Sequence, residues 1–245
     1  MKYFIILTLF ISANLFASNE NTKIHSFSKA KKLLEKKVYT VLPRSTIYCA
    51  GIFDKKKNVI NPNGFASNKH KKRAKRIEWE HVVPAENFGK TFIQWREGDP
   101  SCVNRKGKNF KGRKCASKTS KEYKYMQADM YNLFPAIGAV NALRSNYNFV
   151  AINSGKTLGQ CKMIISKRKV VPTNRAKGII ARTYMYMDKT YDRYNMSSKD
   201  KKLFLAWNKM YPITKEECTR AKLIKKIQGN TNIILEKECK KKNLI

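Results

Sequence analysis

The sequence is poor in acidic residues and in histidine. Only 17 aspartate and glutamate residues stand against 52 lysine and arginine residues, which gives a formal net charge of +35. Such a charge exceeds what solubility requires and attracts polyanions, of which nucleic acid is the commonest. An anionic membrane or cell-wall polymer is the competing partner. The three histidines, His25, His70 and His81, include no His-Glu-x-x-His pattern, which disfavours a zinc peptidase.

Long apolar runs are missing everywhere except at the N-terminus. There Lys2 precedes an apolar segment from Tyr3 to Leu15, and Ala17 offers a cleavage position before a polar run. This is the pattern of a secretory signal peptide, and the segment is short for a transmembrane anchor, which is the alternative. We therefore expect a signal peptide at residues 1–17, a periplasmic or secreted location, and no membrane span in the mature chain.

No two of the six cysteines have the Cys-x-x-Cys spacing of a zinc site. An even number of cysteines in an exported chain predicts disulfide bonds instead. Cys102 and Cys115 close a short loop rich in glycine and lysine, so we expect them to form one pair. The sequence leaves the pairing of the other four open: Cys49, Cys161, Cys218 and Cys239.

Neither an internal repeat nor a shift in composition divides the mature chain, so residues 18–245 are expected to form one domain. Short strand-like runs are scattered between helical ones, which favours a mixed α+β fold over a doubly wound parallel sheet. Expected helices begin at Ser26, at Asn174, after Ser197 and after Thr214. Expected strands cover residues 38–42, 45–49, 78–83, 159–165 and 169–171.

The segment from Arg76 to Pro84 is the strongest candidate for a catalytic site, because it places two glutamates and a histidine in an otherwise apolar run. A carboxylate such as Glu80 can bind a hard cation, and a neutral imidazole such as His81 can accept a proton. The alternative is a strand with an exposed Glu-x-Glu face. Neighbours on a strand face opposite sides. A bulge or the end of the strand near Pro84 must therefore re-aim Glu80 or His81.

Two further stretches carry candidate binding residues. A basic block before the motif could contact phosphates, although such a block is usually only a solvated face: Lys71, Lys72, Arg73, Lys75 and Arg76. Asn132 precedes Pro135, which fits the first turn of a helix running to Arg144. Asn132 is either a cap or turn residue or a neutral oxygen ligand for a metal.

Taken together, these motifs resemble those of the bacterial endonuclease I family of periplasmic and secreted nonspecific nucleases. The resemblance spans about residues 26–235, and its most characteristic stretch is Glu78-Trp79-Glu80-His81-Val82-Val83-Pro84-Ala85. It continues with Gly112-Arg113-Lys114-Cys115, with Asp129-Met130-Tyr131-Asn132-Leu133-Phe134-Pro135-Ala136, and with Arg144-Ser145-Asn146-Tyr147.

The resemblance implies a ββα-metal (His-Me finger) motif at the active site. It implies His81 as general base, Glu80 and Asn132 as ligands of one Mg²⁺, and Arg113 as the residue that holds the phosphate. Mn²⁺ or Ca²⁺ can occupy the same ligands. Arg144 joins the basic block as an expected nucleic-acid contact.

The function expected from these residues is nonspecific hydrolysis of phosphodiester bonds in DNA and RNA, leaving 5′-phosphate ends, by a monomeric enzyme. The alternative is a basic nucleic-acid-binding protein of the cell exterior with no catalysis. A plasmid-nicking assay with and without EDTA distinguishes the two.

Overall fold

The computed structural model describes residues 19–244, so the predicted signal peptide at residues 1–17 lies outside the described residues. The fold mixes helices with short strands, as expected. The helices are α1 (Phe27–Leu33), the π-helix η1 (Leu34–Val38), α2 (Lys71–Ala74), α3 (Ala85–Gly89), α4 (Ile93–Arg96), α5 (Arg113–Thr119), α6 (Lys121–Gln127), the 3₁₀-helix η2 (Met130–Asn132), α7 (Gly138–Arg144), α8 (Asn174–Thr190), α9 (Ser198–Met210), α10 (Lys215–Gln228) and α11 (Ile233–Lys241). The strands are β1 (Ile52–Phe53), β2 (Val59–Asn61), β3 (Ile77–His81), β4 (Leu133–Ile137), β5 (Asn148–Phe149), β6 (Thr157–Leu158), β7 (Cys161–Ser166) and β8 (Lys169–Val171).

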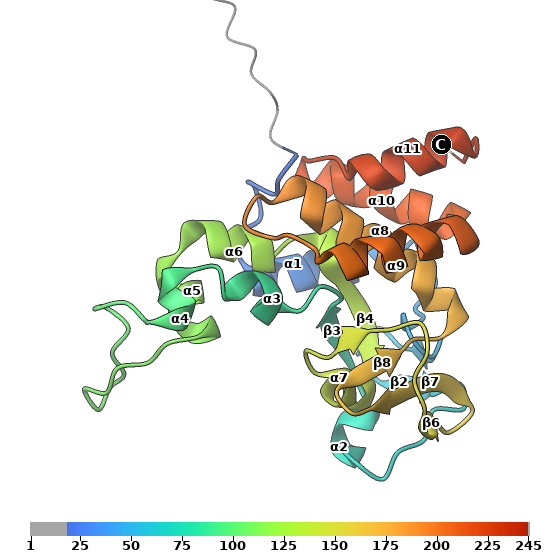
Figure 1. Cartoon of the computed structure of the whole chain (residues 1–245), viewed down its shortest axis with the longest axis horizontal. Coiled ribbons are helices and arrows are strands. Elements are labelled where there is room, and N and C mark those ends of the chain that lie inside the picture. The colour runs from blue at the N-terminus through green and yellow to red at the C-terminus, as the bar shows by residue number, and fades with distance from the viewer. Residues whose placement is uncertain (1–18, 245) are drawn as a thin grey trace, which may run out of the picture.

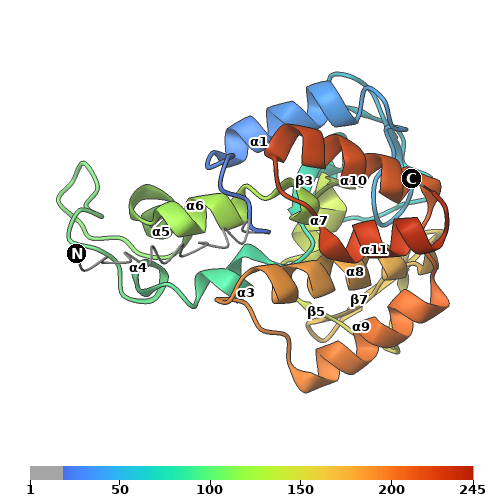
Figure 2. The same ribbon diagram turned by 90° about the horizontal axis from the view of Figure 1, so that it is seen from above.

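The strands form three small sheets among the described residues. β1 pairs with β2, β3 pairs with β4, and the third sheet has the order β5-β8-β7-β6. The β3–β4 pair lies between the C-terminal helices and the third sheet, and α4, α5 and α6 project to one side of this body (Figures 1 and 2). β3 is antiparallel to β4, with Glu80 opposite Phe134 and His81 opposite Leu133, and α7 follows β4 directly.

The C-terminal helices begin and end where local signals place them. Thr214 and Glu217 form a capping box at the start of α10, and Gly229 ends that helix in the left-handed conformation with φ 91°. α11 extends to Lys241, so the basic C-terminal residues are largely helical. The Cys218–Cys239 disulfide, with Cα atoms 5.8 Å apart, ties α10 to α11.

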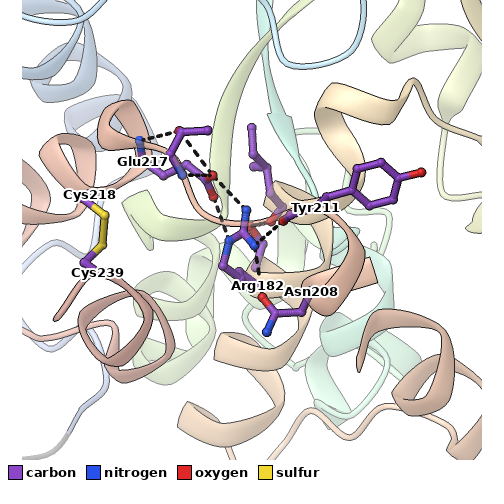
Figure 3. A network of polar contacts seen from close by, with 9 residues as sticks. Arg182, Asn208, Tyr211, Glu217, Cys218 and Cys239 are labelled. Atoms are coloured by element: carbon purple, nitrogen blue, oxygen red, sulfur yellow. Dashed lines mark hydrogen bonds and ion pairs between the residues drawn. A yellow bond between two sulfur atoms is a disulfide. The ribbon is translucent and has the colours of Figure 1, made fainter. Parts of the chain in front are cut away.

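A buried ion pair joins three of these helices. Arg182 of α8 donates hydrogen bonds to both carboxylate oxygens of Glu217, at 2.9 and 2.8 Å, and another to the Asn208 side chain of α9 (Figure 3). A bidentate pair of this kind fixes orientation as well as distance. Two of these helices, α8 and α10, contact η2, which leads directly into β4, and Arg220 of α10 donates a hydrogen bond to the Leu133 backbone oxygen at 2.6 Å.

Two expectations about secondary structure are wrong. The expected strands at residues 38–42 and 45–49 are not present, because η1 continues the first helix to Val38 and the following segment makes turns. Several side chains of residues 38–49 are nonetheless buried, including Val38, Tyr39, Ile47 and Tyr48, although Val41 is exposed. A short apolar run without alternation does not distinguish a strand from a buried turn.

The helix expected from Ala136 begins at Gly138 instead, because residues 133–137 form β4. Pro135 lies opposite Trp79 within that strand. A proline is tolerated there because a two-stranded sheet has only edge strands. This shift of the helix changes which asparagine lies at its start.

Candidate active site

Glu80 and His81 face one cavity of about 330 Å³. Arg113 and Asn141 line it too, and Arg144 lies at its base. Glu80 precedes the last residue of β3, and His81 is that last residue, in regular register with β4. The end of the strand, and not a bulge, therefore allows both neighbours to reach the same space.

The hydrogen bonds of His81 fix its tautomer. Its Nε2 lies 2.8 Å from the backbone oxygen of Gln127, which can only accept, so Nε2 carries the proton. Nδ1 is therefore an unprotonated acceptor, and Nη2 of Arg113 lies 3.5 Å from it. Burial, and then the charge of Arg113, lower the pKa of His81 to about 3. The imidazole is thus neutral at physiological pH.

Glu80 is a buried carboxylate with a cationic support. Its side chain is 3% exposed, and Oε1 accepts a hydrogen bond from the Tyr48 hydroxyl at 2.7 Å. Nη1 of Arg144 lies 3.0 Å from the same oxygen. Burial raises the pKa of Glu80, against the opposing effects of Arg144 and Tyr48. A cation in the cavity would favour the ionised form.

Arg144 does not lie where a nucleic acid could contact it. It is 1% exposed, and it donates hydrogen bonds to the backbone oxygens of His81 and Val82 at 3.0 and 2.7 Å. Its guanidinium also lies over the Phe149 ring, 4.7 Å from the centroid. The expected contact with nucleic acid is thus replaced by a supporting role beneath Glu80 and His81.

Asn132 is not brought to the cavity. It is 0% exposed, its Oδ1 accepts a hydrogen bond from Val83 N–H at 2.8 Å, and its Nδ2 donates to Val83 O at 3.0 Å. Because α7 begins at Gly138, the asparagine on the helix that follows β4 is Asn141, and its half-buried side chain lines the cavity. A helix with Pro135 in its first turn would have placed Asn132 at its start, which is why the sequence pattern pointed to Asn132 and not to Asn141.

A second cavity of about 480 Å³ continues from the first and shares Trp79, His81, Arg113 and Asn141 with it. Two glutamates, Glu35 and Glu78, line it, against six basic residues that come from several elements: Lys31, Lys32, Lys57, Arg73, Arg76 and Arg113. Of the basic block, Arg73 and Arg76 thus reach this groove. Lys71, Lys72 and Lys75 are exposed but line neither cavity.

The Cys102–Cys115 disulfide holds the start of α5. Its sulfur atoms are 2.02 Å apart, as in a covalent bond, and the pair is the one expected. Arg113 is the first residue of α5 and is exposed toward both cavities. The disulfide therefore anchors the element that presents this guanidinium. The remaining cysteines pair as Cys49–Cys161 and Cys218–Cys239.

The sequence profile of the family described as Endonuclease I matches residues 26–239. The chain belongs to the endonuclease I family. As a member of this family it is a nuclease.

Several endonucleases of known name resemble this family member along most of its length. It is 41% identical over 240 residues to "Endonuclease-1" of Buchnera aphidicola subsp. Acyrthosiphon pisum, covering 95% of this chain and 89% of that protein. It is 40% identical over 202 residues to an "Extracellular deoxyribonuclease" of Aeromonas hydrophila, covering 79% and 82%. It is 38% identical over 241 residues to a "Periplasmic deoxyribonuclease" of the same organism, covering 95% and 93%.

The location of this endonuclease I family member is periplasmic or secreted, as the names of these relatives and its three disulfides indicate. Within residues 19–244 no helix combines the length and the apolar character needed to cross a bilayer. The names of these relatives agree with the location expected from the N-terminal pattern.

Proposed function

We propose that the chain hydrolyses phosphodiester bonds of DNA, and of RNA, without sequence preference, and leaves 5′-phosphate ends. The observation that carries this proposal is the cavity in which an unprotonated His81 Nδ1, the Arg113 guanidinium and the Glu80 carboxylate meet. A neutral imidazole is ready to accept a proton from water, and a guanidinium is suited to a phosphate.

The donor atoms of the cavity fit a hard divalent cation. Glu80 offers a carboxylate and Asn141 an amide oxygen, and oxygen is the ligand type that Mg²⁺ selects. Residues 19–244 contain no group of three or more histidine, cysteine, aspartate or glutamate side chains able to hold a metal ion. A site with only two protein ligands suits Mg²⁺, which keeps several of its waters. We propose Glu80 and Asn141 as these ligands, with Asn141 in place of Asn132.

The roles of the side chains follow from their positions. His81 takes a proton from the attacking water at Nδ1, while its Nε2 proton stays bonded to Gln127 and holds the ring in place. Arg113 binds the phosphate charge. A bound Mg²⁺ would supply electrostatic stabilisation of the charge that develops on the phosphate and on the leaving 3′ oxygen. Arg144 and Tyr48 hold the Glu80 carboxylate toward the cavity.

The groove beside the cavity supports the lack of sequence preference. The groove beside the cavity is lined by lysine and arginine from different elements, and such cations bind phosphates, which carry no base information. The same contacts are available on DNA and on RNA, which supports activity on both. We also propose that the chain acts as a monomer, since one chain supplies every group in this mechanism.

The test is cleavage of supercoiled plasmid in Mg²⁺, with and without EDTA. We expect EDTA to abolish nicking, and His81→Ala to lower the rate by a factor of about 10² to 10⁴ while plasmid binding persists. His70→Asn is the matched control, because His70 is exposed and in the left-handed region at φ 56°, which asparagine tolerates. Binding without nicking by the wild-type protein would favour the noncatalytic alternative.

A further inference from the structure

Glu78 lies beside the cavity but takes no part in the mechanism above. It is two residues before Glu80 on β3, and its side chain is 26% exposed. Oε1 accepts a hydrogen bond from Arg73 Nε at 2.8 Å, and Oε2 accepts from Arg73 Nη2. Oε2 also accepts from Asn141 Nδ2 at 3.0 Å. Both oxygens of this carboxylate are thus occupied by donors from neighbouring elements.

The hydrogen bond from Asn141 sets the orientation of that amide. An asparagine side chain can present either its NH₂ group or its oxygen in a given direction. A carboxylate only accepts, so it holds the NH₂ group of Asn141 toward Glu78 and turns Oδ1 the other way. An amide held in this way offers an oxygen, and not a nitrogen, to a cation in the cavity.

The packing around Glu78 leaves the carboxylate little freedom. Gly138, the first residue of α7, donates its N–H to the Arg76 backbone oxygen at 2.9 Å. A Cβ atom at Gly138 would lie 2.6 Å from Arg73 O and 2.9 Å from Glu78 Oε1. Only glycine therefore allows α2, β3 and α7 to meet closely enough for one carboxylate to contact Arg73 and Asn141 together.

We infer that Glu78 is a positioning residue that, together with Arg73, fixes Asn141 with its amide oxygen available to the metal. This inference rests on the proposed function and deepens it. It also assigns Arg73 of the basic block to the support of the metal site, since its guanidinium is paired with Glu78. Supporting partners of metal ligands typically change metal affinity by a factor of 10 to 100.

The experiment measures Mg²⁺ and Mn²⁺ affinity by calorimetry in the full mature chain carrying His81→Ala, so that no turnover is needed. We expect Glu78→Ala to weaken metal binding at least about tenfold. Glu122→Ala is the matched control, since it also removes one acid, from an exposed pair with Arg193. Equal affinities for Glu78→Ala and the control would overturn the inference.

A double-mutant comparison separates positioning from a merely structural role. In an Asn141→Ala background the oriented amide is absent, so Glu78→Gln should leave metal binding nearly unchanged if Glu78 acts through Asn141. With Asn141 present, the same Glu78→Gln change should weaken metal binding, because the carboxylate that accepts hydrogen bonds from Arg73 and Asn141 is lost. An equal loss of metal affinity in both backgrounds contradicts the inference. This comparison also decides the matter if Glu78→Ala does not fold.

Failure of this inference differs from failure of the proposed function. If the protein with Glu78 and Asn141 intact neither binds Mg²⁺ nor, with His81 restored, cleaves plasmid, the proposed function is wrong. If it does both and the Glu78 variants keep full metal affinity, only the positioning role is wrong.

Discussion

At the scale of single residues, Asn132 and Asn141 occupy different environments: Asn132 stabilises the backbone, and Asn141 lines the cavity. Asn132 bonds to both backbone groups of Val83, just beyond the end of β3, and is fully buried. Asn141 lies in the first turn of α7 and is half-buried beside Glu80 and His81. If the proposed metal site is right, the same residue type should therefore have different effects on stability and on metal binding at the two positions.

We predict that Asn132→Ala lowers the free energy of unfolding by about 1–3 kcal/mol, because buried backbone groups of Val83 lose their partners. Asn141→Ala should leave stability within about 0.5 kcal/mol, because the site is partly exposed and alanine favours a helix. It should instead weaken Mg²⁺ binding. Urea unfolding without metal, followed by Mg²⁺ titration of each variant, checks the prediction. The opposite assignment of the two effects would return Asn132 to the metal site.

The low pKa of His81 makes stability depend on pH. The native pKa is about 3, whereas the ordinary value is 6.5. Above about pH 6.5 the imidazole is neutral in both states and contributes no slope. Between about pH 6.5 and 3 the unfolded chain binds a proton that the native protein does not, so the free energy of unfolding falls as pH falls.

We predict that His81→Ala flattens this dependence by up to about 1.4 kcal/mol per pH unit within that window. Thermal or urea unfolding from pH 7 to 4, compared with wild type, measures the difference. His70→Asn controls for the loss of one histidine. Parallel curves for wild type and His81→Ala would show that burial does not suppress protonation of His81.

At the scale of elements, α11 depends on its disulfide. The helix has nine residues, too few to be stable alone, and it buries Leu235 and Cys239 against its neighbours. The Cys218–Cys239 bond spans a sequence separation of 21. We predict that Cys218→Ser/Cys239→Ser lowers stability by about 2–4 kcal/mol.

The loss should be local at first. Hydrogen exchange in residues 233–241 should speed up before exchange in β3 and β4, because α11 packs on α10 and α8 and not on the cavity. Plasmid cleavage at low temperature should be retained. Uniform acceleration of exchange across the chain would show instead that α11 and the β3–β4 pair unfold together.

At the scale of the whole molecule, the excess of positive charge governs affinity. Lysine and arginine from several elements line the groove beside the cavity of Glu80 and His81, and the formal net charge is +35. Each phosphate contact adds about −0.9 to the slope of log affinity against log salt on duplex DNA. A groove that engages several phosphates should therefore bind much more weakly as salt rises.

We predict that Lys32→Gln/Arg76→Gln makes this slope shallower by about 2 without changing sequence preference. Fluorescence anisotropy of duplex DNA, measured with the His81→Ala protein over a range of salt, gives the slope. Lys237→Gln/Lys240→Gln on α11, away from α7, controls for net charge (Figure 1). If both double variants change the slope equally, the groove is not the specific phosphate contact.

Features that depend on interactions between residues close together in the chain could be predicted from the sequence alone. The capping box of Thr214 and Glu217 depends only on hydrogen bonds between residues three apart. The Cys102–Cys115 disulfide could be predicted because the two cysteines lie close together in the sequence. Glu80 and His81 were identifiable because adjacent acid and imidazole are rare in so basic a chain. The α+β character followed from the alternation of short strand-like and helical runs.

Only the folded structure shows which residues from distant parts of the chain lie beside Glu80 and His81. Pairing of β3 with β4 placed Pro135 in a strand, started the helix at Gly138, and so brought Asn141 instead of Asn132 into the cavity. Burial assigned Arg144 to Glu80 and not to a phosphate, and made the His81 imidazole neutral. Strand pairing and burial arise from contacts between segments far apart in the chain, which local patterns do not encode.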